Sequence, residues 1–277
     1  MYYLKQSEWL NSVIIPEGMN VDMLNMDGRL DLILKPGLDI EARGKTVVDL
    51  GCGTGILGAY ALSIGAEFVY FVEQDDQMVH ILKNILPKRL DQSKFQIVHR
   101  DIENLTLRDF DKLEPQVAIG EFYGPRLFDE GYVNYTRHMK KLFPDCRFIP
   151  EKFTGNFYWV DIDYSQPIWP KDQDLIDHFK FMYKEKGFAR YIPLNESNEY
   201  QGKIEYDANT GVFDNYLTFE YQHNSDKILL GVMSAQYHNY QHHYTNIGWV
   251  FTKDEYGKEF KVFFEETNYF NPIKVTL

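Results

Sequence analysis

Apolar runs alternate with amphipathic stretches over the first half of the chain. The runs that predict buried strands and the stretches that predict helices are, in chain order, Thr46–Leu50, Ile56–Ser63 (helix), Phe68–Val72, Gln77–Leu86 (helix), Phe95–Val98 and Val117–Ile119. Strands that alternate with helices are typical of a parallel sheet with helices packed on it. This half therefore predicts an α/β domain with a Rossmann-like, doubly wound and mostly parallel sheet.

A two-residue alternation of apolar and polar positions marks the second half. The segments with this pattern are Phe153–Ile162, Asn215–Gln222, Lys227–Tyr237, Gly248–Phe251 and Glu259–Phe264. Such alternation favours antiparallel strands with one buried face, as in a β-sandwich or a barrel. Between them, Asp172–Lys186 has apolar residues near helical spacing and predicts a helical insertion.

Aromatic residues suggest where the two halves meet. Of the 44 aromatic residues, 29 lie after Phe143, and the 277 residues suffice for one large or two modest domains. We therefore expect a Rossmann-like domain with an N-terminal helical segment over residues 1–145. A β-rich, barrel-like domain should follow over residues 146–277.

Charge and hydropathy argue against several classes of partner. Lys and Arg total 29 against 41 Asp and Glu, a formal net charge of -12 that would repel a phosphate backbone. The longest apolar runs, such as Ile228–Met233, are far shorter than the roughly 20 residues that span a bilayer. Lys5 and Glu8 interrupt the stretch where a signal peptide would be apolar. We expect a cytoplasmic protein without a nucleic-acid or membrane partner.

The two cysteines predict neither a disulfide nor a metal centre. Cys52 and Cys146 have no second Cys and no His at metal-ligand spacing. Two isolated thiols in a chain of this length are most simply explained as reduced side chains. We therefore expect no bound metal.

The segment Val47–Gly55 (VVDLGCGTG) is the strongest local motif. A strand end runs into a turn with glycine at alternate positions, Gly51, Gly53 and Gly55. Glycine lets the backbone turn sharply and approach a ligand closely, and the N-terminus of the next helix offers unpaired N–H donors. Glu73 ends the next apolar strand, where an acidic side chain can accept hydrogen bonds from ribose hydroxyls. The combination predicts a nucleoside-containing cofactor.

Two classes of cofactor fit this turn. Counted from Gly53, the sequence spells the G-x-G-x-x-G of dinucleotide sites, with Glu73 twenty residues on. In that pattern the glycines begin immediately after the strand, whereas here the turn begins at Gly51 and Asp49 lies inside the strand end. The string Asp-x-Gly-x-Gly-x-Gly resembles motif I of the class I S-adenosylmethionine-dependent methyltransferases. That resemblance implies S-adenosylmethionine as the cofactor, with its methionine moiety in the turn and its ribose on Glu73. A turn that binds nothing is the remaining alternative.

The third predicted strand ends where the same resemblance places the adenine. Phe95–Val98 is followed by His-Arg-Asp-Ile at positions 99 to 102. These methyltransferases usually present an acidic or amide side chain and a backbone N–H to the adenine edge at this point. The resemblance thus implies Asp101 as the adenine partner and Ile102 as a residue that packs on the ring. A solvated loop carboxylate is the alternative for Asp101.

Two glutamates nine residues apart follow the fourth predicted strand. Gly120–Glu130 reads GEFYGPRLFDE, so Glu121 and Glu130 flank an aromatic-Gly hinge. The Asn-Pro-Pro-Tyr type of motif, typical of methylation of amide or base nitrogens, is absent. The spacing resembles the double-glutamate loop of the protein arginine methyltransferases. A guanidinium carries five donors in a planar fork, so two carboxylates can hold it and polarise one nitrogen. The resemblance implies Glu121 and Glu130 as catalytic residues and a protein arginine side chain as the methyl acceptor.

The resemblance continues on both sides of these motifs. Met23 and Arg29 stand six residues apart in a helix-like stretch before Asp49. They resemble the family's cofactor-covering segment, whose arginine reaches the methionine carboxylate. Leu142–Pro150 resembles the proline-punctuated link into the family's C-terminal β-barrel. The family also implies a homodimer held by a helical arm, for which Asp172–Lys186 is the candidate segment.

The chain departs from the family at the Thr-His-Trp loop, which buttresses the active site from the barrel. Trp249 lies at a plausible place, but the histidine is missing, and His242 and His243 are out of register. A methyltransferase that acts on a small molecule or on another protein side chain therefore stays open as an alternative. So does a protein that binds S-adenosylmethionine without catalysis.

Overall fold

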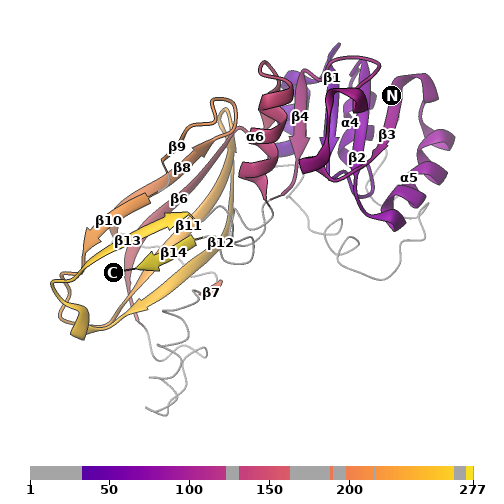
Figure 1. Ribbon diagram of the computed structural model, residues 1–277. Helices are drawn as coiled ribbons and strands as arrows, with labels where there is room; N and C mark the ends of the chain where they lie inside the picture. The colour runs from indigo at the N-terminus through magenta and orange to yellow at the C-terminus, as the bar shows by residue number, and fades with distance from the viewer. Residues whose placement is uncertain are drawn as a thin grey trace.

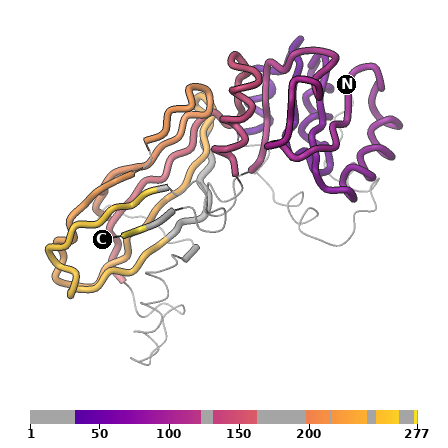
Figure 2. The backbone as a smooth tube through the Cα atoms, in the orientation of Figure 1, coloured from indigo at the N-terminus to yellow at the C-terminus, as the bar shows by residue number. Residues whose placement is uncertain are grey.

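The computed structural model describes residues 33–122, 131–162, 188–189, 198–214, 216–264 and 273–276. These residues form two lobes, one built on a parallel sheet with helices and one built from antiparallel strands (Figure 1). Helix α6 lies between the two lobes (Figure 1). In Figure 2 the chain runs in indigo and magenta through the first lobe before it enters the second lobe, where it ends in yellow.

Five parallel strands form the sheet of the first lobe, in the order β3-β2-β1-β4-β5. Their bounds are Thr46–Leu50 for β1, Phe68–Glu73 for β2, Phe95–His99 for β3, Val117–Gly120 for β4 and Arg147–Ile149 for β5. Every residue of β1, β2 and β4 is buried, as expected for central parallel strands that are covered on both faces. The predicted doubly wound, mostly parallel sheet is confirmed.

Four α-helices accompany this sheet in the described residues: α3 (Lys35–Glu41), α4 (Ile56–Ser63), α5 (Asp76–Arg89) and α6 (Tyr132–Leu142). Three short 3-10 helices lie in the connections of the lobe: η2 (Gln92–Lys94), η3 (Ile102–Asn104) and η4 (Leu107–Asp109). Helix α4 has the predicted bounds, and α5 includes the predicted stretch. None of the helices in the described part of the chain combines the length and the apolar content that crossing a membrane requires.

The second lobe consists of antiparallel strands in two sheets, of order β7-β12-β11-β6-β8-β9 and β10-β13-β14. Their bounds are Lys152–Asp161 for β6, Phe188–Ala189 for β7, Glu199–Asp207 for β8, Phe213–Asp214 for β9, Tyr216–Glu220 for β10, Lys227–Tyr237 for β11, Tyr240–Phe251 for β12, Glu259–Phe264 for β13 and Ile273–Thr276 for β14. A fourth 3-10 helix, η5, spans Lys253–Glu255. Each of the five segments predicted by alternation overlaps a strand, so the β-rich second half is confirmed.

Aromatic rings fill the interior of this second lobe. The Trp159 ring centroid lies 5.2 Å from that of Phe219 and 5.1 Å from that of Phe251. The Phe251 centroid lies in turn 4.7 Å from that of Phe260. All four side chains are at most 8% exposed. The aromatic-rich composition of the second half therefore supplies a core, and large rings in such edge-to-face contact add to the stability of the packing.

The chain passes from one sheet to the other between Ile149 and Lys152. Strand β5 pairs with β4 through residues 147–149, so these residues complete the first sheet. The division expected after residue 145 therefore falls before the last strand of the first lobe. A strand of only three residues is too short to show a pattern in the sequence. The Ile149–Pro150 peptide bond, which follows this strand, is cis.

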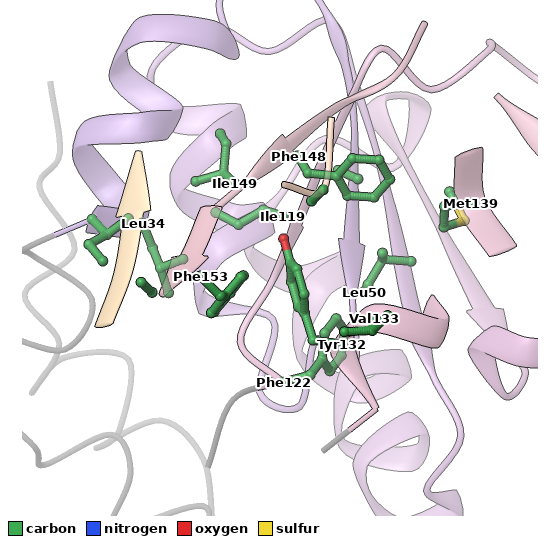
Figure 3. Close-up of a cluster of buried hydrophobic side chains, with 14 of the residues drawn as sticks. Leu34, Leu50, Ile119, Phe122, Tyr132, Val133, Met139, Phe148, Ile149 and Phe153 are labelled. Carbon is green, nitrogen blue, oxygen red and sulfur yellow. The ribbon is translucent and has the colours of Figure 1, made fainter. Parts of the chain in front are cut away.

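One continuous core joins the two lobes. The Tyr132 ring of α6 lies 4.3 Å, centroid to centroid, from the Phe153 ring of β6, and the Tyr132 hydroxyl donates to the Pro150 carbonyl. The hydroxyls of Thr136 and Tyr206 are 2.6 Å apart. Figure 3 shows part of this core, in which Phe153 lies together with Tyr132 and other residues of the first lobe. The lobes are therefore packed against each other through side chains of α6 and β6.

Candidate functional site

The strand order reverses beside β1, and this reversal marks the place for a ligand. The chain runs outward from β1 to β2 and β3 and then returns to β4 on the other side of β1. Ligands of open α/β sheets bind outside the carboxyl ends of the strands at such a point. Gly51 follows β1, Glu73 ends β2 and Glu121 follows β4. The fold therefore brings three of the predicted site residues to one edge of the sheet.

The glycine turn has a backbone that only glycine adopts without strain. Gly51, Gly53 and Gly55 have φ values of +57°, +52° and +75°, which lie in the left-handed region. A Cβ on Gly51 would come within 2.5 Å of Phe122 Cε1, so the close packing at this position also excludes a side chain. A Cβ on Gly53 would meet nothing within 4 Å. The turn is thus packed at Gly51 and open at Gly53, where a ligand can approach the main chain.

Asp49 holds the start of α4 from the buried side of the turn. Its side chain is 1% exposed, and its Oδ2 accepts a 2.8 Å hydrogen bond from the backbone N–H of Gly58 in the first turn of α4. Helix α4 begins after Gly55, which has no side chain to cap it, so Asp49 supplies an acceptor that the helix terminus needs. Burial raises the pKa of Asp49 to about 7; the Gly58 N–H opposes this rise, and the charges of Glu73 and Glu121 add to it.

Glu73 ties the glycine turn to β2. Its Oε2 accepts a 2.8 Å hydrogen bond from the Gly53 N–H, and its Oε1 accepts from the N–H groups of Gln74 at 2.8 Å and Asp75 at 2.9 Å. A carboxylate has about four acceptor positions, so these three bonds leave room for further donors mainly on Oε2. A ribose diol would therefore share Glu73 with the Gly53 N–H. The sequence predicted the position of Glu73 but not this contact with the turn.

Three carboxyl groups lie near the turn, and two of them act on the pKa of the third. The charges of both Glu73 and Glu121 raise the pKa of Asp49. Glu121 is half-buried and directly follows β4. Neighbouring carboxylates stabilise cationic ligands and destabilise anionic ones. Among the described residues, no group of three or more His, Cys, Asp or Glu side chains is arranged to hold a metal ion.

Asp101 is the N-cap of the 3-10 helix η3, which follows β3. Its Oδ1 accepts a 2.8 Å hydrogen bond from the Glu103 N–H, so the carboxylate caps this turn. In the parallel register His99 of β3 is aligned with Glu73 of β2, which places the two strand ends side by side. Ile102 is 7% exposed and belongs to the main core. The adenine contacts expected of Asp101 and Ile102 stay predictions.

Several expected residues lie outside the described residues. These are Met23 and Arg29 of the expected cofactor-covering segment, the second glutamate Glu130, and the expected arm Asp172–Lys186. Trp249, considered as the remnant of the Thr-His-Trp loop, lies within β12, is 1% exposed, and has its ring centroid 6.2 Å from that of Phe157. Its indole is a core side chain of the second lobe.

Comparison of sequences links this edge of the sheet to methyltransferases. The family model "Conserved hypothetical protein 95" matches residues 34–117. A probable protein arginine N-methyltransferase 6.1 of Oryza sativa subsp. indica is 33% identical over 116 residues, which cover 42% of this chain and 29% of that protein. A ribosomal protein L11 methyltransferase of Prochlorococcus marinus is 40% identical over 63 residues, or 22% of this chain and 21% of that protein. The chain thus aligns with less than a third of the length of either relative.

Comparison of structures extends the likeness to both lobes. A crystal structure of PRMT6-SAH superposes with a TM-score of 0.68 at 15% identity, over 93% of this chain and 98% of that chain. The fold resembles that of the protein arginine methyltransferases. A second structure, the Trypanosoma brucei PRMT1 enzyme-prozyme heterotetrameric complex with AdoHcy, has a TM-score of 0.63 at 18% identity over 90% of this chain and 88% of that chain. At such identities the likeness concerns the fold, and it confirms the predicted combination of a Rossmann-like and a β-rich lobe.

Proposed function

We propose that this protein is an S-adenosylmethionine-dependent methyltransferase. The observation that carries the proposal is the glycine turn at the switch point of the sheet, which Glu73 holds through Gly53, which Asp49 adjoins through its bond to α4, and which is open at Gly53. The names of the aligned relatives, which are methyltransferases, support it. So do two of the superposed structures, PRMT6-SAH and the Trypanosoma brucei PRMT1 enzyme-prozyme complex with AdoHcy.

The residues around the turn fit S-adenosylmethionine by their chemistry. Gly53 offers an unobstructed main chain for the methionine moiety, and Glu73 offers acceptor positions for ribose hydroxyls. The carboxylates of Glu73 and Glu121 favour a cationic ligand, and the cofactor has a positively charged sulfonium. Bound at this edge, it supplies an electrophilic methyl group. Asp101 and Ile102 remain the proposed adenine contacts, and Arg29 the proposed partner of the methionine carboxylate.

We propose a protein arginine side chain as the methyl acceptor, held by Glu121 and Glu130. Glu121 stands beside the cofactor turn, where a carboxylate can accept from the guanidinium and orient one nitrogen. The orienting role is the main one, because in-line geometry lowers the barrier to methyl transfer and the proton can leave after the bond has formed. The arginine N-methyltransferase names of the aligned relatives support this acceptor.

Cofactor binding is tested by titration calorimetry with S-adenosylmethionine, S-adenosylhomocysteine and NADH. We expect both sulfur compounds to bind at micromolar or tighter concentrations and NADH not to bind. Glu73→Gln should weaken binding by about tenfold or more, since a hydrogen bond to a charged group contributes roughly 1.5 to 3 kcal/mol. Glu67→Gln is the matched control, because Glu67 is exposed beside the amino end of β2. Tight NADH binding would overturn the assignment of the cofactor.

The acceptor is tested with labelled S-adenosylmethionine and peptides that contain either arginine or lysine. We expect label on arginine peptides, and we expect Glu121→Gln and Glu130→Gln to reduce transfer by at least about a hundredfold, the scale of a well-placed orienting group. Cofactor affinity should change little in both variants. Label on lysine or on small molecules would refute arginine as the methyl acceptor but would leave the methyltransferase assignment intact. Transfer at the wild-type rate in both variants would refute the paired-carboxylate arrangement.

Assembly and location complete the proposal. We propose a homodimer, as the family resemblance implies, and light scattering on the intact chain measures it. A monomer at high micromolar concentration would refute the dimer. We propose the cytoplasm as the location, because Cys52 and Cys146 are both free and buried, as is usual for thiols in a reducing compartment.

A further inference from the structure

The Phe122 ring packs against the backbone of two glycines. A Cβ built on Gly51 would lie 2.5 Å from Phe122 Cε1, and a Cβ built on Gly120 would lie 2.1 Å from Phe122 Cε2. Both distances are far below a carbon–carbon contact of about 3.5 Å, so the ring fits only because neither position has a side chain. One edge of the ring thus lies on the cofactor turn after β1, and the other lies on the end of β4.

The same ring also contacts the beginning of α6. Its centroid lies 5.1 Å from that of Tyr135 in an edge-on arrangement, and 6.2 Å from that of Tyr132. Gly131, the N-cap of α6, has a φ of +82°, and a Cβ there would lie 2.9 Å from Tyr135 Cζ. Phe122 is 8% exposed within this arrangement. Figure 3 shows the Phe122 ring beside Tyr132 and Val133 of α6.

Phe122 also follows Glu121 directly in the chain. A ring that is held on opposite edges fixes the backbone of its own residue, and the Glu121–Phe122 peptide is part of that backbone. The position of the Glu121 carboxylate is therefore coupled through one peptide to the glycine turn. Displacements of about 1 Å in such groups reduce rates by about a hundredfold.

We propose that Phe122 is a positioning residue that locks the cofactor turn, the Glu121 backbone and the start of α6 into one rigid unit. The inference rests on the proposed function, because it assigns the turn to the cofactor and Glu121 to the acceptor. It adds a residue that sets the distance between the two molecules. A smaller side chain at 122 leaves both groups present and loosens their relative placement.

The proposal is tested by comparing the Phe122→Leu variant with a control variant, Phe110→Leu. Phe110 is a matched control: it is 7% exposed in the same lobe, and its ring packs edge-on at 5.0 Å from Tyr70 and 4.9 Å from Phe143. We expect similar losses of thermal stability in the two variants and a cofactor affinity within about threefold of wild type. Only Phe122→Leu should lower kcat, by about tenfold or more, because positioning acts on the transition state. Equal kcat values in the two variants would overturn the proposal.

Gly120→Ala supplies the reciprocal change. An added Cβ at 120 meets the Phe122 ring, so this substitution should displace the ring and lower kcat in the wild-type background. In the Phe122→Leu background the ring is absent, and Gly120→Ala should then have a much smaller effect. Such non-additivity is the mark of direct coupling between two residues. Additive effects in this double-mutant cycle would overturn the proposed ring contact.

Hydrogen exchange separates this inference from the proposed function. In Phe122→Leu we expect faster exchange both at Cys52 and Gly53 of the turn and at Tyr135 of α6, and in Phe110→Leu at neither place. This measurement needs no methyl transfer, so it tests the coupling even if no acceptor is methylated. If wild type binds no S-adenosylhomocysteine while the exchange pattern holds, the proposed function fails and the coupling stands. Unchanged exchange at Tyr135 in Phe122→Leu refutes the coupling itself.

Discussion

At the scale of single residues, the candidate site depends on polar side chains that serve the backbone first. Asp49 accepts from the Gly58 N–H of α4, and Glu73 accepts from the Gly53 N–H of the turn. Both acids were located by the sequence, since an acid in the strand end before a glycine turn and an acid at the next strand end form a recognisable pattern. The bond from the Gly53 N–H to Glu73 was not predicted, because these two residues are twenty positions apart and meet only once β1 and β2 pair.

The buried carboxyl group of Asp49 should make stability depend on pH in a specific direction. Its pKa rises from 3.8 to about 7 on folding, so between these values the folded chain binds a proton that the unfolded chain has released. The free energy of unfolding should therefore fall as the pH rises from about 4 to 7, by an amount on the order of 4 kcal/mol from this group.

Asp49→Asn removes that titration and should flatten the dependence. Thermal melts of wild type and variant from pH 4 to 8 measure it: the melting temperature of wild type relative to Asp49→Asn should be highest at pH 4 and should decline towards pH 8. Asp111→Asn, at an exposed loop position, is the control and should leave the slope unchanged. A constant difference between wild type and Asp49→Asn would contradict the burial of a titrating carboxyl group.

At the scale of helices and strands, the sequence predicted those elements whose apolar residues form a clear pattern. Strand β1 was predicted with its observed bounds because all five of its residues are buried. Strand β8 was missed although Tyr200, Ile204 and Tyr206 alternate with polar residues; Gly202 breaks the row of large apolar side chains, and only Ile204 and Tyr206 are buried. Helix α6 was missed because two of its buried positions are Tyr132 and Thr136. Their hydroxyls find partners only in the folded protein, at Pro150 and Tyr206.

The beginning of α5 offers a test of an element on its own. Asp75 is its N-cap, and the side chain accepts from the N–H groups of Gln77 at 3.0 Å and Met78 at 2.9 Å. Asp75→Ala should lower the free energy of unfolding by about 1 kcal/mol, the usual cost of losing such a cap. Asp76→Ala is the neighbouring control; its side chain is 92% exposed, so its loss should cost less than about 0.5 kcal/mol. Urea titrations measure the free energy of unfolding of both variants. Equal losses in the two would contradict the capping role of Asp75.

At the scale of the whole molecule, two lobes share one core. The main cluster of buried apolar residues contains strand residues of the first sheet, such as Val48 and Ile119, together with Phe153 and Trp159 of the second lobe. The composition change at Phe143 indicated two domains, but composition has no information on how they pack. The contacts at the junction join residues far apart in sequence, so only the folded chain reveals them. Because apolar burial extends across the junction, neither lobe is expected to keep its stability alone.

Calorimetry on the intact chain should therefore show one cooperative unfolding transition. One contact that joins the two lobes is a hydrogen bond: the Tyr237 hydroxyl of β11 donates at 2.8 Å to Glu41 Oε1 of α3. Its removal should shift this transition. Tyr237→Phe should cost about 1.5 to 3 kcal/mol, since the acceptor is a carboxylate, and should lower the midpoint of the single transition. Tyr240→Phe, at a position 43% exposed, is the control and should leave the midpoint nearly unchanged. Two separate transitions in wild type, or a Tyr237→Phe midpoint equal to that of the control, would contradict the shared core and the bond that crosses it.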